Sequence, residues 1–210
     1  AIEIAKQASK TILECYKNFD STKDLHLKED RSPVTIADIS ANHIIVNALA
    51  EVSVGEQKLK LPVLSEESAD IHPVSTKLRL QWDDYWLVDP LDGTKEFIKK
   101  NGEFAVNIAF IKDGKAHFGL IASPVQREIL IGSHETGVFL FHFDQVQNFS
   151  AWKKLSMPEK QNMPLVMTCS RSHHSGPVLQ FIQDLKDISP EITFAKKGSS
   201  LKFFDLAQGV

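Results

Sequence analysis

The segment Trp86-Leu-Val-Asp-Pro-Leu-Asp-Gly-Thr94 constrains the fold and the chemistry of this chain more than any other. Its apolar start predicts a buried strand that delivers Asp89 to its carboxyl end, where α/β proteins place their ligands. Pro90 fixes its own φ angle and stiffens the turn. The carbonyl of Leu91 and the side chain of Asp92 are therefore expected to project toward the same point as Asp89.

The end of this segment predicts the start of a helix. Gly93 allows a ligand to approach the backbone closely, and Thr94 opens a helix indicated by residues 95–100. Free N–H groups and the positive end of the helix dipole favour a phosphate there. Two carboxylates, a carbonyl and an anion pocket in one turn favour Mg²⁺, which prefers oxygen ligands. The alternative is a plain helix-capping turn, but five specified positions in six residues after a strand favour the functional interpretation.

Hydrophobic periodicity predicts two amphipathic helices in the first fifty residues. The first begins at residue 2, and the second follows Thr35, a suitable N-cap with Asp38 in the first turn. For the second helix, the spacing predicts an apolar face built on Ile36, Ile39, His43, Ile44 and Ala48.

Residues 61–65 predict a short buried strand that leads into Glu66 and Glu67. Residues 104–141 predict antiparallel strands, with a hairpin turn at 112–115. Beyond Pro158 the pattern alternates strand, helix (176–185), strand and helix (199–208). We therefore expect a mixed α/β fold with two layered sheets. A largely antiparallel N-terminal part would span residues 1–157, and a smaller C-terminal α/β part residues 158–210.

Charge and cysteine content exclude several classes of protein. Lys and Arg total 24 against 27 Asp and Glu, a formal net charge of −3, so non-specific affinity for nucleic acid has no electrostatic source. No apolar run approaches the roughly 20 residues of a transmembrane helix. Cys15 and Cys169 stand far apart, which is typical of packed thiols in a reducing compartment. We expect a cytoplasmic protein, with peripheral association at the inner membrane as an alternative; the sequence gives no indication of its oligomeric state.

The chain resembles the inositol-monophosphatase-type superfamily of Mg²⁺-dependent, lithium-sensitive phosphatases. The resemblance covers essentially the whole chain and rests first on Leu64-Ser-Glu-Glu67 and on Trp86 through Phe97. Within the superfamily, four further segments are most similar to the bacterial 3′(2′),5′-bisphosphate nucleotidases: Asp30 to Asp38, Lys95 to Phe104, Ser170-Arg-Ser-His173 and Gly198-Ser-Ser-Leu-Lys-Phe203. The resemblance implies an α+β, sugar-phosphatase-like fold, layered as an α-β-α-β-α sandwich.

The resemblance also implies a metal site for two or three Mg²⁺ ions. Glu66 would bind metal and help to hold the attacking water, with Glu67 as its supporting neighbour. Asp89 would bridge two metals, while Leu91 donates its carbonyl and Asp92 its carboxylate.

Catalysis and substrate binding are implied for further positions. Asp38 and Thr94 would form a hydrogen-bonded pair that activates water, with Glu66 as the third catalytic residue. The backbone of Gly93 and Thr94 would grip the phosphate that is cleaved. The substrate would be contacted by Glu66, Leu91, Asp92, Gly93, Thr94, His173, Ser199 and Lys202.

Four converging acids, Asp38, Glu66, Asp89 and Asp92, would have raised pKa values unless cations offset their repulsion. We therefore expect in-line attack by metal-activated water. The expected substrate is a small-molecule nucleotide bisphosphate: adenosine 3′,5′-bisphosphate is converted to AMP and phosphate, a reaction linked to sulfur assimilation. The alternatives are an inositol or sugar monophosphatase, and a non-catalytic phosphate-binding homologue.

The family pattern includes a further C-terminal Trp-Asp-x-Ala-Ala segment, whose Asp completes the second metal site. The sequence reaches Val210 before that motif, and Asp205 is not its equivalent. Without such a segment, we expect the second metal to lose a ligand and activity to fall severely.

Overall fold

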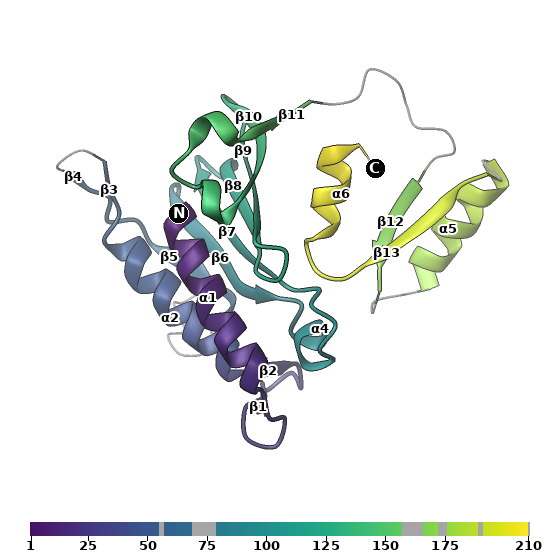
Figure 1. Cartoon of the computed structure of the whole chain (residues 1–210), viewed down its shortest axis with the longest axis horizontal. Coiled ribbons are helices and arrows are strands. Elements are labelled where there is room, and N and C mark those ends of the chain that lie inside the picture. Colours follow the sequence, from purple (N-terminus) through teal and green to yellow (C-terminus); the bar gives the residue numbers. More distant parts are fainter. Residues whose placement is uncertain (55–56, 69–78, 157–165, 172–175, 189–190, 210) are drawn as a thin grey trace.

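The structure, a computed structural model, describes residues 1–54, 57–68, 79–156, 166–171, 176–188 and 191–209. Two long helices, α1 (Ile2–Asn18) and α2 (Ile36–Ala50), cover one face of a seven-stranded sheet (Figure 1). On the other side of the sheet follow the short helix α6 (Lys202–Gln208), a two-stranded sheet and helix α5 (Gly176–Ile188). This order of layers confirms the predicted α-β-α-β-α arrangement.

The seven-stranded sheet is antiparallel except for one pair. Its strands run in the order β11, β10, β9, β8, β7, β6 and β5, and only β5 and β6 are parallel. Their bounds are β5 (Val63–Ser65), β6 (Tyr85–Asp92), β7 (Ala105–Lys112), β8 (Lys115–Ser123), β9 (Glu128–Ser133), β10 (Gly137–His142) and β11 (Lys153–Leu155). The predicted hairpin turn is confirmed at Asp113 and Gly114, whose φ angles of 50° and 69° suit a two-residue turn between twisted strands.

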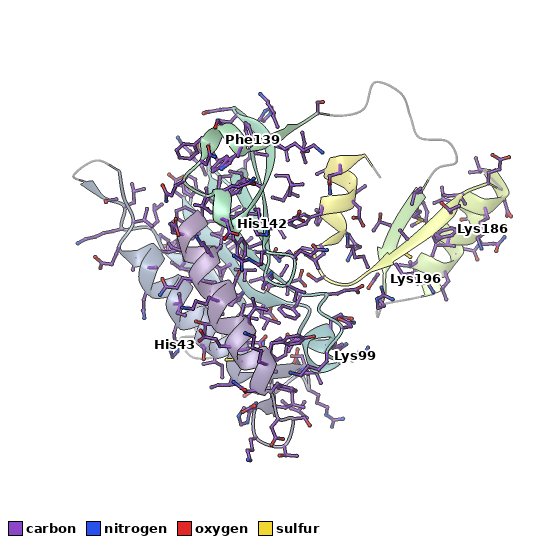
Figure 2. All side chains as sticks on the ribbon, in the orientation of Figure 1. His43, Lys99, Phe139, His142, Lys186 and Lys196 are labelled. Carbon is purple, nitrogen blue, oxygen red and sulfur yellow. The ribbon has the colours of Figure 1, made fainter. Side chains whose placement is uncertain are left out.

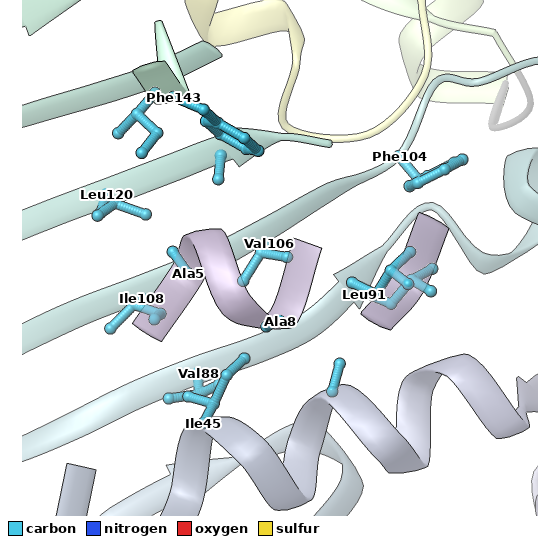
Figure 3. Packing of buried hydrophobic residues seen from close by; sticks show 14 of the residues in the cluster. Ala5, Ala8, Ile45, Val88, Leu91, Phe104, Val106, Ile108, Leu120 and Phe143 are labelled. Atoms are coloured by element: carbon cyan, nitrogen blue, oxygen red, sulfur yellow. The ribbon is translucent and has the colours of Figure 1, made fainter. Parts of the chain in front are cut away.

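Alternate residues of the sheet build two apolar layers. Figure 3 shows Ala5 and Ala8 of α1 and Ile45 of α2 packed toward Val88 and Ile108 of the sheet. A second cluster forms on the opposite face, where α6 brings Leu201 and Phe204 against Ala105, Leu130 and Leu140. The large sheet is thus buried between helices on both sides along part of its length.

Helix α2 begins as predicted, but its buried face differs from the prediction. The Thr35 side chain caps the helix and Asp38 completes a capping box. The buried positions are Ala37, Asp38, Ala41, Asn42, Ile45 and Leu49. Ile36 is 43% exposed, and His43 lies on the outer side of the helix (Figure 2). The prediction was wrong at Ile36 and His43, whereas Ile44 packs partly buried against the core. The fully buried positions include small alanines, which let α1 pack closely, and the capping-box residue Asp38.

The smaller sheet pairs β12 (Val166–Ser170) with β13 (Thr193–Lys197) in parallel, and α5 connects them along the chain. The predicted strand-helix-strand-helix order is confirmed. The last helix begins at Lys202 and not at Ser199. Ser199 has a φ angle of 59° and lies in a tight turn before the helix.

The remaining elements are short. The polar stretch before residue 32 forms half of a hairpin, in which β1 (Leu25–Leu27) pairs with β2 (Pro33–Thr35). A second hairpin joins β3 (Ser53–Val54) and β4 (Gln57–Lys58). The expected domain boundary at residue 157 falls outside the described residues, so the division of the chain into two parts stays a prediction. Within the described part of the chain, no helix is long and apolar enough to span a membrane.

The buried face of α2 can be tested by substitution. Ile45→Ala should lower the free energy of unfolding by about 2–5 kcal/mol, because it opens a cavity between α2 and the sheet. Ile36→Ala, the matched control on the exposed side, should change it by no more than about 0.5 kcal/mol. Urea unfolding of both variants provides the measurement, and equal losses would contradict the observed face.

Candidate active site

A β-bulge near the end of β6 brings two carboxylates to the same side of the sheet. Asp89 pairs with Asn107 of β7, and Asp92 pairs with Ala105, so three steps along β6 match two along β7. In a regular strand, residues three apart point to opposite faces. The extra residue of the bulge brings the side chains of Asp89 and Asp92 to the same face, and both line one cavity.

The turn after β6 requires a glycine. Gly93 has a φ angle of 98°, and a Cβ there would lie 2.8 Å from the carbonyl oxygen of Glu103 and 3.1 Å from the Cβ of Ser199. Helix α4 (Thr94–Ile98) starts immediately after it, shorter than the predicted 95–100 helix. The absence of a side chain at Gly93 therefore allows three backbone segments to meet beside the carboxylates.

The cavity has a volume of about 480 Å³. Its lining includes eight of the predicted site residues: Glu66, Asp89, Leu91, Asp92, Gly93, Thr94, Ser199 and Lys202. A larger cavity of about 990 Å³ lies over the apolar part of the same sheet and shares Glu66 and Asp89. The other six predicted site residues line the smaller cavity alone, whereas Leu87, Ile121 and Val138 line the larger one.

Asp38 and Thr94 are hydrogen-bonded to each other as expected. The Thr94 hydroxyl donates to Asp38 Oδ1 at 3.0 Å, and Asp38 Oδ2 accepts bonds from the Thr35 amide at 2.8 Å and hydroxyl at 2.5 Å. Asp38 is 1% exposed, and burial raises the pKa of its carboxyl group although these donors oppose the shift. The starts of α2 and α4 are thereby joined through one buried carboxylate.

Asp89 carries the largest electrostatic strain at this site. Burial, reinforced by the negative charges of Asp92, Glu66 and Asp38, raises the pKa of Asp89 to about 8. Its Oδ1 atom is buried and has no hydrogen-bond partner among the residues that the structure describes. A carboxylate in this environment is stabilised when a cation lies beside it.

Asp92 is held from the opposite side by the turn that precedes α6. Its Oδ2 atom accepts bonds from the Ser199 hydroxyl at 3.0 Å and from the Ser200 amide. The amide group of Asn107 lies 3.4 Å from the same oxygen, and the Ser200 hydroxyl donates to Asn107 Oδ1 at 2.8 Å. Sequence reasoning missed Asn107 and Ser200, because neither belongs to the acidic motif.

Glu66 and its neighbour Glu67 follow β5 in a 3-10 turn, η1 (Glu66–Ser68). Lys28 donates to Glu66 Oε1 at 3.1 Å and to Glu67 Oε1 at 2.7 Å. Burial raises the pKa of Glu67, and the ion pair with Lys28 opposes that shift. Lys28 was also missed by sequence reasoning, since a lysine in a charged stretch 38 residues away carries no local signal.

Besides Ser199, two further substrate contacts were predicted in the C-terminal part, Lys202 and His173. Lys202 lines the cavity, and its ammonium group donates to the carbonyl of Ser199. His173 lies outside the described residues, so its predicted contact with substrate stays a prediction.

The oxygen-rich lining fits a hard divalent cation. The three carboxylates of Glu66, Asp89 and Asp92 and the carbonyl of Leu91 suit Mg²⁺ better than a softer metal. Within the described ranges, no three His, Cys, Asp or Glu side chains already stand close enough to form a complete metal site. A bound cation would have to compete with Lys28 for Glu66.

Comparison with known proteins identifies the family. The sequence model of the inositol monophosphatase family matches residues 1–210 of this chain. The chain therefore belongs to the inositol monophosphatase family, whose members are metal-dependent phosphatases that generally use Mg²⁺, as the sequence predicted.

Within that family, the chain is similar to bacterial nucleotidases. It is 37% identical to the 3′(2′),5′-bisphosphate nucleotidase CysQ of Escherichia coli K12, over 99% of this chain and 75% of the relative. The CysQ of Buchnera aphidicola is 33% identical over 99% of this chain and 70% of the relative. The crystal structure of CysQ from Bacteroides thetaiotaomicron matches with a TM-score of 0.80 and 32% identity, covering all of this chain and 75% of that one.

The raised pKa of Asp89 predicts how stability depends on pH when divalent cations are removed. The folded protein holds the Asp89 proton up to about pH 8, whereas the unfolded chain releases it near about pH 4. Between these values the folded state binds more protons, so its stability falls as the pH rises. We therefore expect Asp89→Asn to be more stable than the native protein near pH 8 in EDTA. Its melting temperature should be at least ~2 °C higher, which corresponds to a gain of ~1 kcal/mol in the free energy of unfolding.

The matched control is Asp113→Asn, which removes one carboxylate from the β7–β8 turn and should leave the melting temperature unchanged. Added Mg²⁺ should reverse the order, since only the native protein gains stability from binding it. Circular dichroism melts provide the measurement. An Asp89→Asn variant that melts below the native protein in EDTA would contradict the assigned charge strain.

Proposed function

We propose that this chain is a Mg²⁺-dependent 3′(2′),5′-bisphosphate nucleotidase that removes the 3′-phosphate of adenosine 3′,5′-bisphosphate to give AMP and phosphate. One observation carries the proposal. Thr94, which is hydrogen-bonded to Asp38, lines the same cavity as the carboxylates of Glu66, Asp89 and Asp92. The nucleotidase activity of the curated relatives, similar over 99% of this chain, gives the substrate class. Such an enzyme would clear a by-product of sulfur assimilation.

We assign the metal-binding role to Glu66, Asp89, Asp92 and the carbonyl of Leu91, all of which line the cavity. When bound, Mg²⁺ lowers the pKa of a water molecule and neutralises charge on the transferred phosphoryl group. We propose two or three ions. The buried oxygen of Asp89 that lacks a hydrogen-bond partner among the described residues would be stabilised by a bound cation, which supports Asp89 as one of the ligands.

The Asp38–Thr94 pair is assigned to proton removal. Because the Thr94 hydroxyl donates a hydrogen bond to Asp38 Oδ1, its oxygen can accept a hydrogen bond from the attacking water. As that water loses a proton to Thr94, the hydroxyl proton of Thr94 passes to Asp38. The amide and hydroxyl of Thr35 hold the other oxygen of Asp38 and fix the direction of the carboxylate. The water oxygen bonds to phosphorus, the bond from phosphorus to the ribose 3′-oxygen breaks, and that oxygen takes up a proton.

The substrate is assigned to the same cavity. Its volume of about 480 Å³ lies within the usual range for small-molecule sites. The backbone of Gly93 and Thr94 would bind the phosphate that is cleaved. Ser199 and Lys202 face the cavity from the C-terminal part, where they would contact the nucleotide and its retained phosphate. His173 is proposed for the same role on the family resemblance alone.

An inositol or sugar monophosphatase is the second candidate, favoured by the family model that matches the chain. A non-catalytic phosphate-binding homologue is the third. We also propose a cytoplasmic location, since the two cysteines are not joined to each other and Cys15 is only partly buried. Peripheral membrane association is a weaker alternative, because the net charge of −3 supplies no attraction to anionic lipid.

The substrate class can be tested on the full-length protein with Mg²⁺ present. Phosphate release from adenosine 3′,5′-bisphosphate should exceed release from inositol 1-phosphate by at least about tenfold in kcat/KM, or ~1.4 kcal/mol. Lithium should inhibit the reaction and Asp89→Asn should abolish it. Preference for inositol 1-phosphate would select the second candidate, and the absence of any phosphate release would select the third.

The proton-transfer role of Thr94 can be tested with two variants of similar size. Thr94→Val removes the hydroxyl that donates to Asp38 and should lower kcat by about 10²–10⁴-fold. Thr94→Ser keeps that hydroxyl and should remain within about tenfold of the native kcat, a loss of no more than ~1.4 kcal/mol. Phosphate release at saturating Mg²⁺ and substrate measures both. A valine variant as active as the serine variant would remove Thr94 from the mechanism.

A further inference from the structure

Glu103 joins three segments that are far apart in the sequence. It lies between α4 and β7, and its carboxylate accepts two hydrogen bonds from Arg171, at 2.7 Å from Nε and 2.6 Å from Nη2. The amide of Gly198 donates to the same carboxylate at 2.8 Å. Arg171 Nη2 also donates to the carbonyl of Lys196 on β13, a strand that Figure 2 places in the C-terminal part. One acid therefore binds the ends of both strands of the small sheet.

The three segments meet with no spare room. A Cβ at Gly198 would lie 2.8 Å from Glu96 Cγ and 3.0 Å from Glu103 Oε2. On the other side, the carbonyl of Glu103 is the atom that a Cβ at Gly93 would meet at 2.8 Å. The backbone of Glu103 thus contacts the turn that carries Asp92, while its side chain contacts the turn that precedes α6.

The residues held by Glu103 lead directly to the carboxylate of Asp92. Gly198 is followed by Ser199, whose φ angle of 59° is unfavourable for a serine and persists only where the surroundings impose it. The Ser199 hydroxyl and the Ser200 amide both bind Asp92 Oδ2. A shift of the Gly198 amide would therefore move two of the donors that orient Asp92.

Electrostatics keeps the Glu103 carboxylate charged. Its hydrogen bonds from Arg171 hold the pKa of Glu103 below its usual value. Burial opposes this shift, and the amide of Gly198 and the charges of Arg171 and Lys197 add to it. Paired N–H bonds from a guanidinium to a carboxylate fix orientation as well as distance. The contact therefore has the directional character needed to hold a turn in place.

We propose that Glu103, held by Arg171, is a positioning residue for the metal site: it fixes the 198–200 turn, which in turn orients the Asp92 carboxylate toward bound Mg²⁺. The inference rests on the proposed function, because it takes Asp92 as a metal ligand. Glu103 itself is not among the residues that line the cavity. Residues that orient metal ligands through hydrogen bonds commonly change metal affinity by about 10–100-fold when they are lost.

The test measures Mn²⁺ binding to the full-length protein by isothermal titration calorimetry, without substrate. Glu103→Gln keeps the shape of the side chain but loses its charge and one acceptor oxygen. We expect Mn²⁺ affinity to fall by about tenfold. The Mg²⁺ concentration for half-maximal phosphate release should rise by a similar factor, with a smaller change in the rate at saturating Mg²⁺. Glu135→Gln, which removes the same charge from the exposed β9–β10 turn, should bind Mn²⁺ like the native protein.

A second variant keeps the inference falsifiable if Glu103→Gln does not fold. Arg171 is 45% exposed, so Arg171→Lys should fold; it keeps the charge but loses the paired bonds, and should weaken Mn²⁺ binding less than Glu103→Gln. The double variant should be no weaker than Glu103→Gln alone, because both residues act as a unit. If the folded variants bind Mn²⁺ within about twofold of the native affinity, a difference below ~0.5 kcal/mol, the positioning role of Glu103 is overturned. The proposed function would not be affected by that result. A native protein that binds no Mn²⁺ would overturn the proposed function and this inference with it.

Discussion

The placing of the Asp89 carboxylate in a largely buried position beside three other acids is the constraint around which this site is arranged. Asp89 lies near Asp92, Glu66 and Asp38, and burial, reinforced by the negative charges of these three acids, raises the pKa of Asp89 to about 8. The chain supplies the opposing forces from many directions. Thr35 binds Asp38, Ser199 and Ser200 bind Asp92, and Lys28 binds Glu66. Each acid is thus held by its own donor set, while the buried oxygen of Asp89 is left for a metal.

Secondary structure and chemistry use the same atoms at this site. The carboxylate of Asp38 closes the capping box of α2 with one oxygen and accepts the Thr94 hydroxyl with the other. Thr94 is also the first residue of α4. The proposed catalytic pair therefore lies where two helices begin, and the hydrogen bonds that start α2 also orient the carboxylate proposed to receive the proton. The orientation of Asp38 is therefore fixed by the same hydrogen bonds that cap α2.

The sequence predicted most of the helices and strands, and it predicted that Asp89 and Asp92 lie together after β6, because those signals are local. Strand alternation, the Asp113-Gly114 turn and the Thr35 cap each depend on a few neighbouring residues. The errors arose where distant contacts decide. The buried face of α2 is the one that packs against α1 and the sheet, and Ser199 leaves the predicted helix to bind Asp92, 107 residues away. Lys28 carries no local pattern. Glu103 and Arg171 both lie in segments that resemble the family, but nothing in those segments indicates that the two side chains pair, because the ion pair forms only after the chain has folded.

The β-bulge in β6 also limits how the chain can change in length. Asp89 and Asp92 face one cavity because one more residue is present on β6 than on β7 between their paired positions. Deleting a single residue there would restore regular alternation. One of the two carboxylates would then point to the opposite face of the sheet, the face covered by α1 and α2. No side-chain replacement could repair that inversion. The spacing between the two acids is therefore intolerant of insertions and deletions, a stricter requirement than the identity of either residue between them.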